Sequence, residues 1–133
     1  LPIRDFEDHS TGKEYFSVDK ENANIINSAN GKLIAVGTTV VKCLESCDWK
    51  LNEDKKSNQI QATTGISETF IKPGHQFKAN IKAMLTNFHL PQSSLLLLTS
   101  AYIGKELLLD AYNEAVKENY RFYTLGDAML IFR

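Results

Sequence analysis

The sequence lacks a long hydrophobic run and an excess of charge of either sign. Its longest apolar run, residues 128–132, is far shorter than the roughly 20 residues that a membrane-spanning helix needs. Fifteen Lys and Arg balance sixteen Asp and Glu, so the overall basic charge of many nucleic-acid-binding domains is absent, although a local basic patch stays compatible with that sum. The first residues include Arg4, Asp5 and Glu7 and do not resemble a signal peptide. These absences favour a cytoplasmic protein.

Cysteine is also scarce, and the chain does not begin with methionine. Cys43 and Cys47 are four residues apart on a predicted helix, so they lie on one face of it. Two thiols cannot fill a tetrahedral metal site alone, and we expect both to be reduced and structural, with no bound metal. The start at Leu1 indicates that the chain is a segment of something longer.

The remaining composition is that of a globular domain. Hydrophobic residues make up 43% and charged residues 23% of the 133 residues. Asp19 and Ser93 are predicted N-caps, and Gly31 and Gly104 are predicted to end the helices that precede them. The predicted helices are 19–30, 40–47, 94–103 and 105–118, and the predicted strands are 15–18, 33–36, 69–71, 83–88 and 128–132.

Helices that alternate with short apolar strands predict an α/β fold. We expect mostly parallel, buried strands flanked by helices, in a single domain over residues 1–133. A parallel sheet of about three strands is thin, which indicates part of a larger sheet. The charged residues 48–58 are predicted to form a solvated loop, and 120–123 to be extended.

The first candidate site is Gly37–Thr38–Thr39, between a strand and a helix. In open α/β sheets ligands bind at the carboxyl ends of strands, and the N–H groups of a helix start favour an anion. The alternative is that one threonine simply caps the helix. The segment matches neither GxGxxG nor GxxxxGK[ST], so no standard nucleotide loop is indicated.

The second candidate is the pair Asn87 and His89, which on a strand would share one face, opposite Phe88. Histidine suits proton transfer near neutral pH. An equally supported alternative is that His89 is a structural residue, hydrogen-bonded inside the core. A second histidine, His75, follows Pro73–Gly74 and is expected to be exposed and inert.

The third candidate combines Tyr120, Arg121 and Tyr123 with Gly126–Asp127. Interleaved aromatic and basic residues can stack on bases and pair with phosphate. A Gly–Asp pair before a strand is equally typical of a turn, and that is the first expectation from the residues alone.

Four blocks together resemble a known family. They are AVGTTVVKCLES (35–46), TFIKPGHQF (69–77), MLTNFHLPQSSLLLL (84–98) and YRFYTLGDAMLI (120–131). In order and spacing they are similar to the S-adenosylmethionine:tRNA ribosyltransferase-isomerases of queuosine biosynthesis. The resemblance implies an α/β main domain, of which this chain would be the C-terminal segment. The inserted β-barrel domain of that family has no counterpart here.

The resemblance also implies a reaction. The ribosyl moiety of S-adenosylmethionine moves to 7-aminomethyl-7-deazaguanine at the wobble position of a tRNA with a GUN anticodon. Epoxyqueuosine forms, and adenine and methionine leave. S-adenosylmethionine is a substrate, and no further cofactor and no membrane is implied; we expect a monomer. The alternatives are a non-catalytic segment that only binds tRNA or a partner, and a nucleotide-binding domain with unrelated chemistry.

Roles follow from this chemistry placed on the matched motifs. His89 and Asp127 are the expected proton-transfer residues, with acid and base unassigned. The expected substrate-binding residues are Thr38, Thr39, Asn87 and Glu14, and the expected tRNA-binding residues are Arg121, Tyr120 and Tyr123.

The chain departs from the family pattern at three positions. Gly12 stands where a histidine is expected, Val40 where a serine is expected and Lys42 where an arginine is expected. Lys42 keeps the charge of arginine but loses its two-pronged hydrogen bonding.

Overall fold

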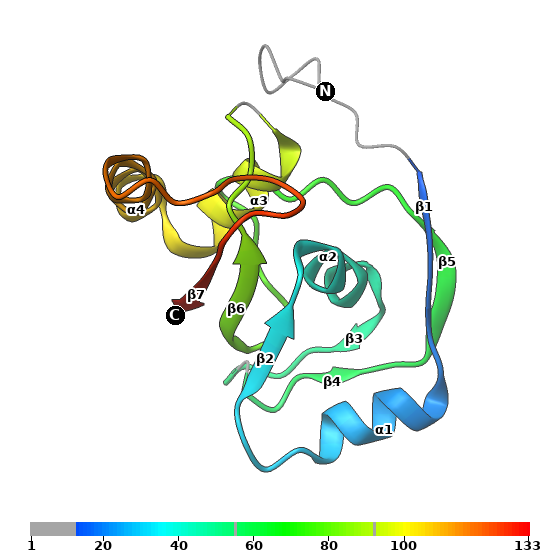
Figure 1. Ribbon diagram of the computed structural model, residues 1–133. Helices are drawn as coiled ribbons and strands as arrows, with labels where there is room; N and C mark the ends of the chain where they lie inside the picture. Colours follow the sequence, from blue (N-terminus) through cyan, green and yellow to red (C-terminus); the bar gives the residue numbers. More distant parts are fainter. Residues whose placement is uncertain (1–12, 55, 92) are drawn as a thin grey trace.

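A computed structural model describes residues 13–54, 56–91 and 93–133 (Figure 1). Its helices are α1 (Lys20–Ser28), α2 (Thr38–Ser46), α3 (Ser94–Ile103) and α4 (Lys105–Lys117). Its strands are β1 (Glu14–Val18), β2 (Leu33–Val36), β3 (Trp49–Lys50), β4 (Gln59–Ile60), β5 (Thr63–Ser67), β6 (Ile81–Asn87) and β7 (Ala128–Phe132). The α/β class is therefore confirmed. Position 12 lies outside the described residues, so the departure at Gly12 has no structural account.

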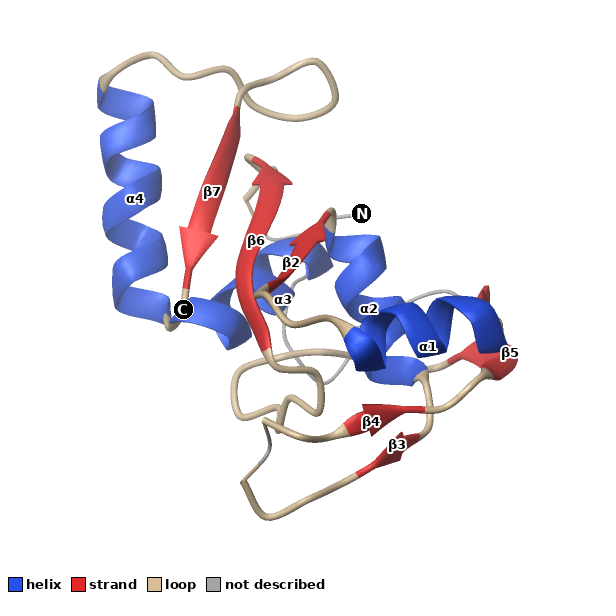
Figure 2. Cartoon of the chain, turned by 90° about the horizontal axis from the view of Figure 1, so that it is seen from below, coloured by secondary structure: helices blue, strands red, loops and turns tan. Residues whose placement is uncertain are grey.

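The main sheet has three strands in the order β2-β6-β7. Strands β2 and β6 are parallel, whereas β7 runs antiparallel to β6. Two further antiparallel pairs are β1–β5 and β3–β4, and Figure 2 shows the β3–β4 pair near α1 and away from the main sheet. Among the described strands only one pair is parallel, so the expected predominance of parallel pairing is wrong.

The local signals at helix ends were mostly correct. Asp19 caps α1 by accepting a hydrogen bond from the Asn22 N–H, and Ser93 caps α3 in the same way. Gly104, at φ 90°, separates α3 from α4. Gly31 is not the expected C′ residue, because α1 ends at Ser28 and its C-cap is Ala29 in extended geometry.

One strand prediction and one loop prediction were wrong. Residues 69–71 are irregular, and the strand of that region is β5, which pairs along its whole length with β1. Within residues 48–58, Trp49–Lys50 forms β3 against β4. Both errors have one cause, because pairing with a distant partner strand decides strand formation and local composition does not reveal it.

One face of the main sheet carries the core. Ala35, Met84 and Ile131 are cross-strand neighbours on this face, and each is at most 7% exposed. Helices α2 and α3 cover it with side chains that include Leu44 and Leu98. We call it the covered face.

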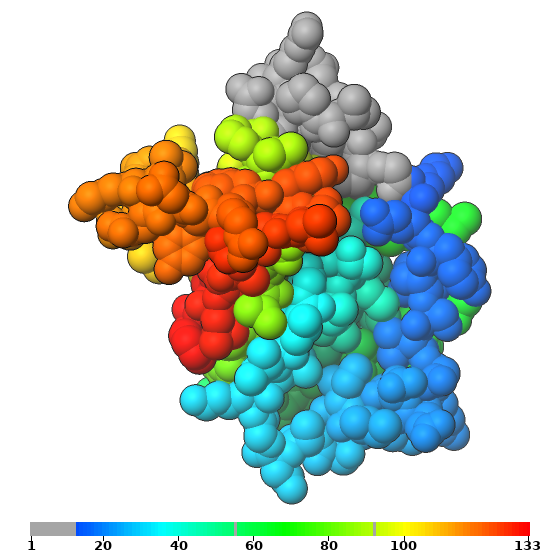
Figure 3. Space-filling view, viewed as in Figure 1, coloured from blue at the N-terminus to red at the C-terminus, as the bar shows by residue number. Residues whose placement is uncertain are grey.

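The opposite, open face is apolar but largely exposed. Its exposed side chains are Ile34, Val36, Leu85, Leu130 and Phe132. Figure 3 shows β2 (cyan) and β7 (red) at the surface of one side of the molecule, with part of β6 between them. The expectation of buried strands is therefore correct for one face only. A contiguous exposed apolar patch of this kind is uncommon on a free-standing domain.

Two neighbouring residues of β7 test this division. Ile131→Ala is expected to lower the free energy of unfolding by about 2–4 kcal/mol, because it leaves a cavity on the covered face. Leu130→Ala removes a side chain that is 51% exposed and is expected to cost less than about 1 kcal/mol. Urea denaturation of both variants measures the difference. Equal losses would contradict the assignment of the two faces.

No helix within the described residues is both long and apolar enough to cross a membrane.

Candidate active site at the strand ends

The three candidate segments meet at one edge of the main sheet. In Figure 1 the arrowheads of β2 and β6 point to the same end, where β7 begins. The register agrees, because Val36 pairs with Leu85 and Asn87 pairs with Ala128. The Gly37 N–H donates to the Leu85 carbonyl at 2.8 Å. We call Thr38, Thr39, Asn87, His89 and Asp127 the strand-end site.

Thr38 and Thr39 form the first turn of α2. The N-cap is Gly37, at φ 97°, and no side chain caps the helix. The capping alternative is therefore wrong for both threonines. Thr38 is buried and Thr39 is exposed. The first N–H groups of a helix have no acceptor within it, and their positive dipole end favours a negative charge.

Asn87 and His89 do not share one face, because β6 ends at Asn87 and the strand alternation stops there. The exposed Asn87 amide donates to the Tyr123 and Thr124 carbonyls at 3.0 and 3.4 Å. His89 is only 8% exposed, and its Nε2 lies 2.9 Å from the hydroxyl of the buried Thr86.

Two features of His89 bear on its chemistry. Its backbone N–H donates to the Tyr112 hydroxyl at 2.8 Å, which fixes the chain just beyond β6. Burial lowers the pKa of His89 below its ordinary value, because desolvation disfavours the imidazolium. His89 is therefore neutral at pH 7 and able to accept a proton. The sequence analysis did not single out Tyr112, because nothing local indicates this contact between residues 23 positions apart.

The lowered pKa of His89 predicts a pH dependence of stability. Between that pKa and the unfolded value of about 6.5, the folded protein binds fewer protons than the unfolded chain. The contribution of His89 to the free energy of unfolding is therefore complete above about pH 6.5 and falls on acidification through this window. Urea denaturation of the wild type and His89→Gln from pH 7.5 to about 5 should show a smaller slope in the variant. Parallel curves would contradict the prediction.

Asp127 and Arg121 close the loop that precedes β7. The carboxylate of Asp127 accepts from the Arg121 backbone N–H at 2.7 Å and from Arg121 Nη2 at 3.0 Å. The Asp127 N–H donates back to the Arg121 carbonyl at 2.8 Å. Hydrogen bonds from Arg121 lower the pKa of Asp127, so this carboxylate is ionised at neutral pH. Turn chemistry is thus a real function of Asp127.

The loop 121–127 is tightly built and attached to β6. A Cβ on Gly126 would lie 2.6 Å from the Arg121 carbonyl oxygen, so only glycine fits at this position. The Tyr123 N–H donates to the Phe88 carbonyl, and the Phe88 N–H donates to the Asp127 carbonyl. Residues 120–123 are not a strand, because Tyr123 has a positive φ of 76°.

An aromatic cluster centred on Phe88 packs beside the loop 121–127. Phe88 lies within 5.2–5.6 Å, between ring centroids, of Tyr112, Tyr120 and Phe122. Tyr120 is half exposed, and Tyr123 and the Arg121 side chain are mostly exposed. The expected tRNA-contacting residues are therefore accessible and lie beside a packed aromatic cluster.

Glu14 lies beside α2 without belonging to the strand-end site. Its carboxylate is 3.4 Å from Nζ of Lys42, which is one turn further along the helix than Thr38. Lys42, which stands where an arginine is expected, therefore forms an ion pair with Glu14. Val40 is exposed at the same end of the helix.

Both cysteines are free thiols. The Cys47 Sγ donates to the Cys43 carbonyl at 3.3 Å, and burial raises the pKa of Cys47 to about 11. In the described part of the chain, no group of three or more His, Cys, Asp or Glu is arranged to hold a metal ion.

Comparison with known proteins agrees with the residue pattern. The family described as "Queuosine biosynthesis protein" matches residues 1–131. Two curated relatives, from Clostridioides difficile and Desulforamulus reducens, are 48% and 45% identical over 98% of this chain. Both are named S-adenosylmethionine:tRNA ribosyltransferase-isomerase, and the chain spans 37% of the length of each.

A solved structure shows the same fold. The crystal structure of S-adenosylmethionine tRNA ribosyltransferase from Thermotoga maritima is 38% identical and superimposes with a TM-score of 0.72. The match covers 87% of this chain and 39% of that one. With the family match over nearly all residues, this chain belongs to the queuosine biosynthesis family of tRNA-modifying transferase-isomerases.

Proposed function

We propose that this chain supplies part of the active site of an enzyme that transfers the ribosyl moiety of S-adenosylmethionine to a tRNA base. The acceptor is 7-aminomethyl-7-deazaguanine at the wobble position of a GUN anticodon, and the products are epoxyqueuosine, adenine and methionine. The observation that carries the proposal is the convergence of three family motifs at one sheet edge, in a chain whose relatives bear this enzyme name. We also propose a cytoplasmic location, because a tRNA anticodon is a cytoplasmic substrate, and we expect a monomer.

The strand-end site fits the chemical needs of this reaction. The sulfonium of S-adenosylmethionine acidifies the neighbouring C5′ hydrogens, and adenine leaves more easily once protonated. A neutral His89 can accept a proton from substrate or pass one on, which is general acid–base catalysis by an imidazole. Asp127 is ionised and bonded to Arg121, which favours a positioning role for it over the proton transfer that the sequence indicated.

The other strand-end residues provide binding groups. The first turn of α2, with the exposed Thr39 and the neighbouring Thr38, is suited to the methionine carboxylate. Asn87 is held by the loop 121–127 and remains exposed, so its amide oxygen is free to bond ribose or base. Glu14 lies one element away, where its carboxylate pairs with Lys42 in the middle of α2.

The loop 121–127 is the proposed contact with the anticodon. Tyr120 and Tyr123 present aromatic faces on which an unstacked base can lie, and Arg121 presents a guanidinium to phosphate. Unpaired anticodon bases are the usual targets of such aromatic contacts.

A second candidate is a segment that binds tRNA without catalysing the transfer. It is favoured by the length of the chain, which spans 37% of the curated relatives. The two candidates make different predictions for a chimera in which this chain replaces the matching segment of the Clostridioides difficile protein.

The test is the release of adenine from S-adenosylmethionine by this chimera. We expect release only when tRNA that carries the precursor base is present. A folded chimera that binds this tRNA but releases no adenine would contradict the proposal and support the binding-only reading. The parent protein from Clostridioides difficile is the positive control.

A further inference from the structure

The end of the main sheet opposite the strand-end site carries two adjoining hollows of about 370 and 400 Å³. Asn80 and Lys82 line both of them, at the point where β6 begins. Because β6 runs from Ile81 to Asn87, this end and the strand-end site are about 20 Å apart. Neither the enzyme name of the relatives nor the motif analysis assigns a role to this end.

The hollows are lined by basic residues. We call the set Lys32, Lys56, Lys78, Lys82 and Arg133 the basic rim. None of the described residues that line either hollow is Asp or Glu, although acidic residues outnumber basic ones in the chain as a whole. The near-zero net charge therefore hides a basic surface at one end of the sheet.

Most of these cations have no carboxylate partner. Within the described residues, no member of the basic rim forms an ion pair. Lys56 alone lies close enough to a carboxylate, that of Asp54, to lower its pKa. Unpaired cations that share a surface repel one another, and a bound polyanion relieves that repulsion.

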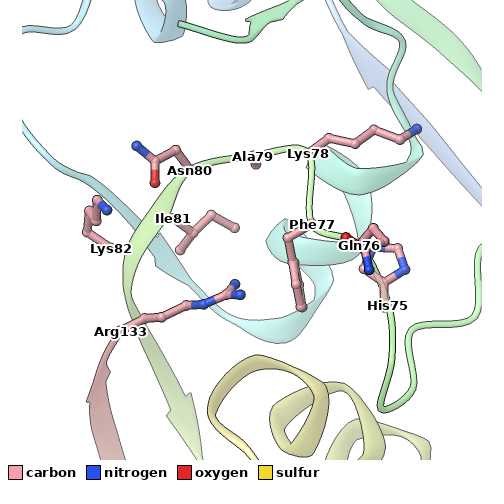
Figure 4. A pocket seen from close by; sticks show the side chains of 9 residues that line it. All are labelled: His75, Gln76, Phe77, Lys78, Ala79, Asn80, Ile81, Lys82 and Arg133. Atoms are coloured by element: carbon pink, nitrogen blue, oxygen red, sulfur yellow. The ribbon is translucent and has the colours of Figure 1, made fainter. Parts of the chain in front are cut away.

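Part of the rim is held in place. The Arg133 guanidinium lies 4.9 Å from the centroid of the Phe77 ring and 5.3 Å from that of Tyr102. Figure 4 shows Arg133 reaching across the hollow toward Phe77, with Lys82 on its far side. Glu45 fixes the opposite wall by accepting hydrogen bonds from the N–H groups of Lys78 and Ala79. Groups that are fixed before binding lose less conformational freedom when they contact a phosphate backbone.

We propose that the basic rim binds the phosphate backbone of the tRNA stem whose loop reaches the strand-end site. This inference rests on the proposed function, because tRNA is the polyanion named there. Contacts of this type fix the position of an RNA without reading its sequence. The rim would then hold the stem while loop 121–127 contacts the anticodon bases.

The test is the salt dependence of RNA binding by this chain. Fluorescence anisotropy with a labelled, unmodified RNA hairpin of the anticodon arm gives the affinity at several salt concentrations. Lys32→Gln/Lys82→Gln is expected to weaken binding on the order of 10- to 100-fold at about 0.1 M salt, and to reduce the slope of log affinity against log salt by about 2. The matched control is Lys20→Gln/Lys105→Gln, which removes the same charge from α1 and α4 and should leave both quantities unchanged.

Either of two results would overturn the inference: equal losses in the two double variants, or no binding of the hairpin by the unsubstituted chain. Circular dichroism and thermal unfolding establish that both variants fold. The hairpin lacks the precursor base and cannot react, so this result is independent of adenine release. A chimera that releases adenine with an unchanged KM for tRNA after Lys32→Gln/Lys82→Gln would leave the proposed function intact and reject the rim.

Discussion

Replacing Glu45 with leucine is expected to lower the free energy of unfolding by about 3 kcal/mol. The side chain of Glu45 is fully buried, and its carboxylate accepts from the N–H groups of Lys78 and Ala79 at 2.9 Å. It also lies 2.8 Å from Nε2 of His75. Leucine leaves these buried and partly buried donors without an acceptor, and an unmet buried donor costs about 1–3 kcal/mol.

Glu114→Leu is the matched control, because this residue lies on the exposed side of α4. Guanidinium denaturation of the two variants gives the comparison. Glu45→Gln keeps one acceptor oxygen and should fall between the wild type and Glu45→Leu. If Glu45→Leu is as stable as Glu114→Leu, the carboxylate does not hold residues 75–79 in place.

Glu45 also illustrates what the sequence could not reveal. His75 was expected to be exposed and inert, yet its side chain is only 18% exposed and is paired with a carboxylate 30 residues earlier. Nothing in the Pro73–Gly74–His75 turn signals that partner, because the contact depends on how the loop packs against α2. Local turn chemistry was correct here, and Gly74 has the positive φ of 98° that such a turn uses.

Helix positions were the most predictable part of the fold. Asp19, Ser93 and Gly104 act within one turn of their own positions, so the sequence around them is sufficient. Strands were harder to predict, because β3 and β5 exist through pairing with β4 and β1. The apolar character of β2 and β7 was evident, but composition did not indicate that one face of each is open.

The meeting of the candidate segments could be predicted, whereas their contacts could not. Thr38 and Thr39 come directly after β2, and Asn87 is the last residue of β6. Because these two strands are parallel, their carboxyl ends lie at the same edge of the sheet. Asp127 reaches that edge because β7 is antiparallel, which the sequence did not indicate. The sequence analysis gave Arg121 and Asp127 separate roles, and the structure joins them in one loop.

The second large effect is expected at His89. Glutamine at this position can keep a hydrogen bond to the Thr86 hydroxyl, and the backbone N–H still reaches Tyr112. It cannot take up and release a proton near neutral pH. If His89 transfers a proton in the rate-limiting step, His89→Gln should lower turnover by about 100-fold or more. The KM for S-adenosylmethionine should change much less, since the imidazole acts on the transition state.

The account depends most on the claim that chemistry takes place at the strand-end site. It is tested most directly by the rate of adenine release from the chimera carrying His89→Gln, compared with the same chimera carrying His75→Gln. Both variants exchange an imidazole for an amide, but His75 lies at the opposite end of the sheet, among the residues that line the first hollow. With tRNA at a saturating concentration, the account predicts a loss of about 100-fold for His89→Gln and nearly full activity for His75→Gln. Equal rates in the two variants would contradict it.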